Sequence, residues 1–107
     1  MYFRHTPEIW QDYPQLAAMA IFADGIDAHA AVDDRLAGYL AHAEAAAGAS
    51  EAALPPIQAW RRAFARMGMK PTQYRCASEA LLRRYRRDRV LPRVHPLVDL
   101  CNAVPTR

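Results

Sequence analysis

The sequence is poor in the residues and runs that mark several common classes of protein. It has two cysteines, Cys76 and Cys101, and four glycines in 107 residues. Two cysteines without a secretory signal indicate a reducing compartment rather than a disulfide framework. The glycines form no phosphate-binding loop, and no apolar run approaches the roughly 18 residues of a membrane span. We therefore expect a soluble cytoplasmic protein with no membrane partner.

Patterns of metal ligands and of catalytic side chains are also missing. The four histidines have no metal-ligand spacing with Cys76 or Cys101, so both cysteines are expected to be small buried side chains. No serine lies in a nucleophile elbow, and no Ser, His and Asp have the spacing of a triad. The sequence predicts no metal and no cofactor, and the catalytic residues stay unassigned.

Hydrophobic residues make up 52% of the chain, enough for a core in one small domain over residues 1–107. Many of them are alanine, which buries little area. The larger side chains are therefore the expected core: Trp10, Leu16, Ile21, Phe22, Leu36, Tyr39, Leu40, Ile57, Trp60, Phe64, Met67, Leu81, Leu82, Leu97, Val98 and Leu100.

Apolar periodicity and helix-end signals predict four main helices, over residues 29–47, 56–67, 73–87 and 96–103. A short helical turn is expected at Thr6–Ile9, with Thr6 as N-cap and Pro7 in the first helical position. Gly68 is placed to end the second main helix. Pro105 is expected to stop the last one. Trp60, Phe64, Leu81 and Leu82 are expected to pack together.

Residues 15–25 form a mostly apolar run that ends at Asp24-Gly25. Its length and its stop favour a buried strand over a helix. The fold class is then α+β, mainly helical with one or two strands. A lone strand lacks backbone partners, so either the run is helical or the sheet is incomplete within these 107 residues.

Charge is divided unevenly along the chain. Residues 1–54 hold two basic and eight acidic residues, a net charge of −6, whereas residues 55–107 hold twelve basic and three acidic residues, a net charge of +9. Such a dipole can steer an anionic partner to one face. The alternative is that the two halves attract each other within the fold.

The basic third helix is the sharpest local feature. Arginine suits bidentate contacts with phosphate, and the interleaved Tyr74 and Tyr85 could stack on bases. Charge reversal at Arg86 and Arg87 would then weaken binding and flatten its salt dependence. The alternative is a solvated face whose arginines pair locally with Glu79 or Asp88. The nucleic-acid-binding candidates are Lys70, Arg75, Arg83, Arg84, Arg86, Arg87 and Arg89.

A second group of polar residues is a candidate for substrate binding: Tyr74, Ser78, Glu79, Asp99 and Asn102. Ser78 and Glu79 are adjacent on a helix and point in different directions. Asp99 and Asn102 are three apart and share a face, so they could hold a polar ligand together. The alternative for this pair is a helix cap or a buried hydrogen-bonded pair.

The order and spacing of these motifs resemble a known family, the B3/B4 domain of the phenylalanyl-tRNA synthetase beta chain in its free-standing form. The resemblance runs over nearly the whole chain. It rests on Pro7-Glu8-Ile9-Trp10, Tyr13-Pro14, Trp60-Arg61-x-x-Phe64-x-x-Met67-Gly68-x-Lys70-Pro71-Thr72-x-Tyr74-Arg75, Ser78-Glu79-Ala80-Leu81-Leu82-Arg83-Arg84, Leu91-Pro92 and His95-Pro96-Leu97-Val98-Asp99-x-x-Asn102-Ala103-Val104.

The resemblance implies an editing-type α/β fold and a partner that is tRNA or aminoacyl-tRNA. In the synthetases this domain hydrolyses wrongly charged aminoacyl-tRNA. Here Pro105-Thr106-Arg107 stands where the family continues with a serine, an apolar strand and a second half. Only the N-terminal part of the domain is therefore matched, and a complementing second half or self-association is expected.

Three functions stay open at this point. The chain is a trans-editing hydrolase when completed by a second half, a non-catalytic RNA- or protein-binding fragment, or a truncated inactive product. We expect that it does not deacylate aminoacyl-tRNA alone, because its polar groups have no spacing that assembles an oxyanion site. Incubation with mischarged tRNA tests this, and turnover that depends on Ser78, Glu79 or Asn102 would contradict it.

Overall fold

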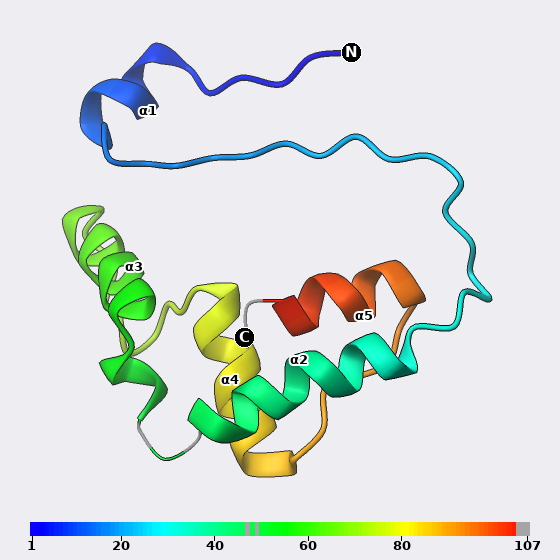
Figure 1. The fold of residues 1–107 in the computed structure, drawn as a ribbon. Coiled ribbons are helices and arrows are strands. Elements are labelled where there is room, and N and C mark those ends of the chain that lie inside the picture. Colours follow the sequence, from blue (N-terminus) through cyan, green and yellow to red (C-terminus); the bar gives the residue numbers. More distant parts are fainter. Residues whose placement is uncertain (47, 49, 105–107) are drawn as a thin grey trace.

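The computed structural model describes residues 1–46, 48 and 50–104, and its regular elements within these ranges are all helical. Five α-helices and one short 3-10 helix follow one another along the chain (Figure 1). They are α1 (Pro7–Asp12), α2 (Asp33–Ala46), η1 (Glu51–Ala53), α3 (Pro55–Arg66), α4 (Ala77–Asp88) and α5 (Pro96–Ala103).

The predicted α+β class is wrong, because the described residues contain no strand. The run over residues 15–25 is neither a strand nor a helix: after a turn at its start it continues as irregular, exposed chain. The physical reason is the one that made the strand doubtful. A strand needs a neighbour for its backbone N–H and C=O groups, and no second strand is present among the described residues to supply one.

α3 lies close to its expected bounds, whereas α2 starts four residues later than the expected residue 29. α2 begins at Asp33, with Asp33 and Asp34 in its first turn, where negative charge favours the helix dipole. α3 ends at Arg66, and Gly68 follows with φ +80°. The backbone N–H of Met69 donates to Phe64 O at 2.9 Å, so Gly68 ends this helix as predicted. The expected helix end at residue 47 and the stop at Pro105 lie outside the described residues.

The third main helix starts later than predicted. The backbone N–H groups of Gln73 and Tyr74 both donate to Lys70 O at 2.9 Å, which closes a separate turn. Cys76 is then extended, with ψ 162°, and serves as the N-cap of α4. The expected start at residue 73 is wrong for this reason. α5 matches its predicted range, and the His95 ring caps it by accepting from Leu97 N at 3.2 Å.

The buried side chains form two groups. The larger contains Ala43, Ile57, Cys76, Leu82, Tyr85 and Leu91, with Leu40, Leu54, Phe64 and Leu81 packed against it. The smaller contains Val32, Leu36 and Ala103, with Tyr39 and Leu100 against it. The smaller group joins α2 to α5, while η1 contacts both α3 and α4. The helical body thus has a core that is divided and thin.

Several residues expected in the core are exposed instead: Trp10, Ile21, Phe22, Trp60, Met67, Leu97 and Val98. Trp60 keeps 45% of its surface exposed and contacts the Phe64 ring at a centroid distance of 6.0 Å. The predicted packing of Trp60 with Leu81 and Leu82 is therefore wrong, although Phe64, Leu81 and Leu82 do belong to one group. Cys76 is buried as predicted, but Cys101 is exposed.

Residues 1–31 form an arm that starts at the N-terminus, contains α1 and joins the helical body at α2 (Figure 1). Arg66 of α3 holds this arm through two contacts. Its guanidinium donates to the backbone oxygen of Asp12 and lies 5.0 Å from the centre of the Tyr13 ring. The Cα radius of gyration is 15.8 Å, against about 13 Å for a compact chain of this length. The arm accounts for this open shape.

Candidate functional site

The arginines of α4 lie on its exposed sides because its buried residues occupy the remaining side. Glu79, Leu82 and Tyr85 recur every three residues and are the buried residues of this helix. Arg83 with Arg86, and Arg84 with Arg87, are also three residues apart, so each pair stacks along the helix surface. The same periodicity that builds the core therefore places four arginines in two exposed rows.

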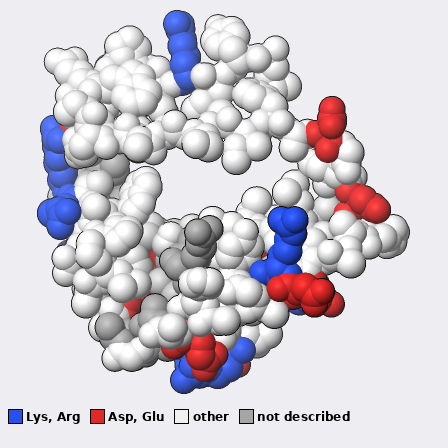
Figure 2. Space-filling view, viewed as in Figure 1, with Lys and Arg blue, Asp and Glu red and all other residues white. Residues whose placement is uncertain are grey.

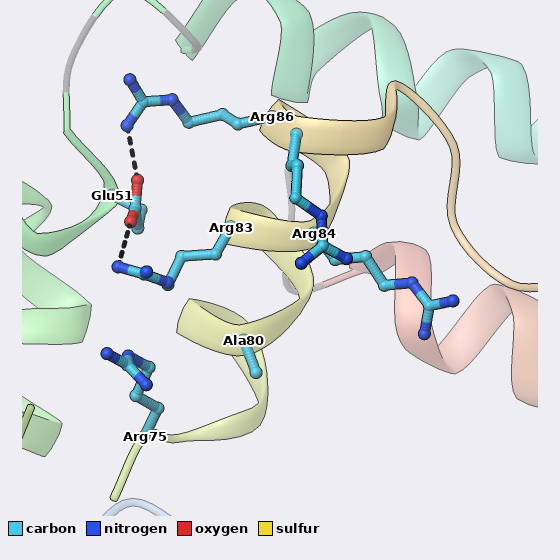
Figure 3. A pocket seen from close by; sticks show the side chains of 7 residues that line it. Glu51, Arg75, Ala80, Arg83, Arg84 and Arg86 are labelled. Atoms are coloured by element: carbon cyan, nitrogen blue, oxygen red, sulfur yellow. Dashed lines mark hydrogen bonds and ion pairs between the residues drawn. The ribbon is translucent and has the colours of Figure 1, made fainter. Parts of the chain in front are cut away.

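A pocket of about 620 Å³ lies on this side of the helix (Figure 3). Five of its lining residues are arginines and one is acidic: Glu51, Arg75, Ala80, Arg83, Arg84, Arg86 and Arg87. Arg75 comes from the segment before α4, and Glu51 comes from η1. We call this surface the arginine groove. It contains five of the seven predicted nucleic-acid-binding residues.

Glu51 lies between two of these arginines. Its Oε2 accepts from Arg86 Nη1 at 2.6 Å, and its Oε1 accepts from Arg83 Nη1 at 3.2 Å. The Glu51 side chain is 7% exposed, while those of Arg83 and Arg86 are 49% and 43% exposed. Burial raises the pKa of the Glu51 carboxyl, but the hydrogen bond from Arg86 and the charges of Arg86 and Arg83 outweigh it, so its pKa lies below 4.5.

Glu79 is shared in the same way but is wholly buried. It accepts from Arg61 through both carboxylate oxygens, with Arg61 Nε 3.2 Å from Oε2, and Arg75 Nε lies 3.6 Å from Oε1. Its side chain has no exposed surface. The hydrogen bond to Glu79 raises the pKa of Arg61. Glu79 thereby ties α3 and the segment before α4 to α4 itself.

Asp88, the last residue of α4, is the third carboxylate that two arginines share. Arg87 donates to it from Nε at 2.7 Å and from Nη2 at 3.0 Å, and Arg84 Nε lies 3.8 Å from Oδ2. The Arg87 hydrogen bond holds the pKa of Asp88 below its ordinary value. Six arginines thus share three carboxylates, two to each, which leaves a net charge of +3 on this group.

The other predicted nucleic-acid-binding residues lie outside the groove. Lys70 is exposed in the turn before α4. Arg89 has a left-handed backbone with φ 58° and pairs with Glu44 at 3.2 Å. Tyr74 is 53% exposed, so it is free to stack. Tyr85 is not, because it is buried in the core and its hydroxyl donates to Glu44 at 2.7 Å.

The predicted substrate-binding residues do not share the lining of the arginine groove. Asp99 is buried on α5 and accepts from Val94 N and Arg93 Nε, each at 2.8 Å. The backbone N–H of Val94 is the main cause that lowers the pKa of Asp99. Asp99 thus binds the segment that precedes α5, whereas the N-cap of this helix is His95. Ser78 and Asn102 are half-buried.

Sequence reasoning missed Glu51 and Arg61. Glu51 follows an alanine-rich stretch and is separated from Arg83 by 32 residues, and Arg61 lies on a different helix from Glu79. No local spacing links such pairs. For Glu51 the available signal was the opposite charge of the two halves of the chain, which Glu51–Arg86, Glu44–Arg89 and Asp33–Arg93 now explain in part. Arg61 and Glu79 lie in the same half, so this signal did not reach their pair.

Figure 2 shows charged side chains around the outer margin of this face, with basic and acidic groups side by side only in its lower part, and an opening in the middle of the view. Within the described part of the chain, no three His, Cys, Asp or Glu side chains gather as a metal site. None of the described helices has the length and apolar character needed to cross a membrane.

Comparison with known proteins gives no match of any kind, whether to a family model, a curated protein or a solved structure. The resemblance to the synthetase domain therefore rests on the residues quoted above.

Proposed function

We propose that this chain binds tRNA through the arginine groove on α4. The observation that supports the proposal is the two-to-one sharing of Glu51, Glu79 and Asp88 by six arginines. Local pairing alone would need one arginine for each carboxylate. The excess of +3 over this group of nine side chains, five of whose arginines line the groove, is a reason to expect an anionic partner.

The side-chain chemistry of the groove suits phosphate. A guanidinium carries five donors in a rigid fork, so an arginine that already contacts a carboxylate still has donors to offer. Arg84 and Arg87 keep 52% and 74% of their side chains exposed. Tyr74 precedes Arg75 in the chain and is exposed, which makes it a candidate to stack on an unpaired base.

Hydrolysis of aminoacyl-tRNA is the alternative suggested by the family resemblance. Of its candidate residues, Glu79 is held by Arg61 and has no exposed surface, and Asp99 is held by Arg93 and by Val94 N. A general base must reach the proton it removes. Binding without hydrolysis is therefore the function that we propose for this chain.

The test compares two variants that lose the same charge. Arg86→Gln/Arg87→Gln leaves Arg83 on Glu51 and Arg84 on Asp88, so only the spare charge of the groove is removed. Arg4→Gln/Arg35→Gln removes two exposed arginines elsewhere. Measured by fluorescence polarisation with labelled tRNA at low salt, the first variant should bind about tenfold to a hundredfold more weakly than wild type. Equal affinities for the two variants would contradict the proposal.

A further inference from the structure

The side-chain contacts of Glu51 are those of an anion bound between two guanidinium groups. One carboxylate oxygen faces Arg83 at 3.2 Å, and the other faces Arg86 at 2.6 Å. The two arginines are one helical turn apart, and both line the groove (Figure 3). Arginine pairs of this kind recognise carboxylate and phosphate by the same geometry. Glu51 thus marks a position that a phosphate group also fits.

The surroundings of Glu51 favour phosphate over the carboxylate once a ligand is present. Arg75, Arg84 and Arg87 line the same pocket, so an anion that enters it gains neighbours which do not contact Glu51 in the structure. A phosphodiester carries one negative charge, as Glu51 does. Exchange of one anion for the other would leave the charge between Arg83 and Arg86 unchanged.

The element that carries Glu51 is suited to give way. η1 is a single turn of three residues, Glu51–Ala53, closed by the bond from Leu54 N to Glu51 O at 3.2 Å. Glu51 ties it to α4 through ion pairs with Arg83 and Arg86. Withdrawal of Glu51 therefore requires no α-helix to unfold.

We propose that the space between Arg83 and Arg86 is a phosphate-binding position that Glu51 occupies in the free protein, and that a phosphate of the nucleic acid displaces Glu51 on binding. This inference rests on the proposed function and adds a competitor within the chain. Glu51 weakens phosphate binding in proportion to the stability of its own contacts, and it keeps weaker anions out of the groove.

The test is the affinity of Glu51→Gln for tRNA, with Glu44→Gln as the matched control. Both variants lose one negative charge, and Glu44 pairs with Arg89 and Tyr85 outside the groove. We expect Glu51→Gln to bind about tenfold more tightly than Glu44→Gln, because one competing charge-assisted contact is removed. Equal binding by the two variants, or weaker binding by Glu51→Gln than by wild type, would overturn the inference.

The outcomes separate this inference from the proposed function. Binding by wild type without a gain in Glu51→Gln contradicts the inference alone, whereas absence of binding by wild type and by both variants contradicts both. If Glu51→Gln does not fold, displacement of Glu51 is tested on the wild-type protein. In a titration with inorganic tripolyphosphate, the carboxyl carbon resonance of Glu51 should shift together with the side-chain N–H resonances of Arg83 and Arg86. A Glu51 resonance that stays in place would refute displacement.

Discussion

Glu51, Glu79 and Asp88 each form ion pairs with two arginines, and their different burial gives them different roles. Glu79 has no exposed surface, whereas Asp88 keeps 33% of its side chain exposed. Pairs within α4, such as Arg84–Asp88, were predictable because residues four apart on a helix are neighbours. The pairs that involve Glu51 and Arg61 were not predictable, since they depend on how separate elements meet.

Replacement of the buried Glu79 should destabilise the fold more than replacement of an exposed carboxylate. Glu79→Ala would leave Arg61 and Arg75 without their shared carboxylate at a buried position. Because both arginines can partly turn to water, we expect a loss of about 2–3 kcal/mol in the free energy of unfolding, below the range for fully buried pairs. Urea denaturation measures it. Asp24→Ala, in the exposed arm, is the control, and an equal effect there would contradict a structural role for Glu79.

Tyr85 provides a dependence of stability on high pH. Its hydrogen bond to Glu44, its burial and the Glu44 charge raise its pKa above 10.0, and Arg89 offsets this only in part. A neutral phenol is thus favoured by folding, so this contribution is fully present below pH 10.0 and is lost as the pH rises through the higher folded pKa. The free energy of unfolding should fall more steeply above that pH in wild type than in Tyr85→Phe. Identical slopes would show that the Tyr85–Glu44 bond does not form.

At the scale of elements, the helices were predictable from the sequence, whereas the side chains that they bury were less so. Proline placement and Gly68 predicted α3 and its end, and His95-Pro96 predicted α5. The late start of α4 was not visible, because the Lys70–Tyr74 turn and the extended Cys76 separate two segments with similar helical propensity. The strand at residues 15–25 failed because a strand depends on a partner that the local sequence does not reveal.

Two residues of α3 that were both predicted in the core differ in their burial. The sequence treats Trp60 as core, for which replacement by alanine would cost about 3–5 kcal/mol. In the structure Trp60 is 45% exposed and Ile57 only 2%. We therefore expect Trp60→Ala to lower the free energy of unfolding by about 1 kcal/mol, mostly through its contact with Phe64, and Ile57→Ala by about 2–4 kcal/mol. A larger effect for Trp60→Ala in thermal or urea unfolding would restore the predicted core.

At the scale of the whole molecule, the opposite charges of the two halves are partly used up inside the fold. Asp33, Glu44 and Glu51 of the acidic half pair with Arg93, Arg89, Arg83 and Arg86 of the basic half. The alternative of internal attraction, raised from the sequence, is therefore confirmed for these residues. It does not account for the whole basic half, since the group around α4 keeps its excess of +3.

The salt dependence of tRNA binding is the most direct measure of that excess of +3. If three spare charges contact phosphates, the plot of log affinity against log salt concentration should have a slope near −3, at about −0.9 for each contact. Arg86→Gln/Arg87→Gln should reduce the slope to about −1, and Arg4→Gln/Arg35→Gln should leave it close to the wild-type value. Affinity that does not change with salt, or a slope unaltered by loss of Arg86 and Arg87, would show that the arginines of α4 serve only to hold the fold together.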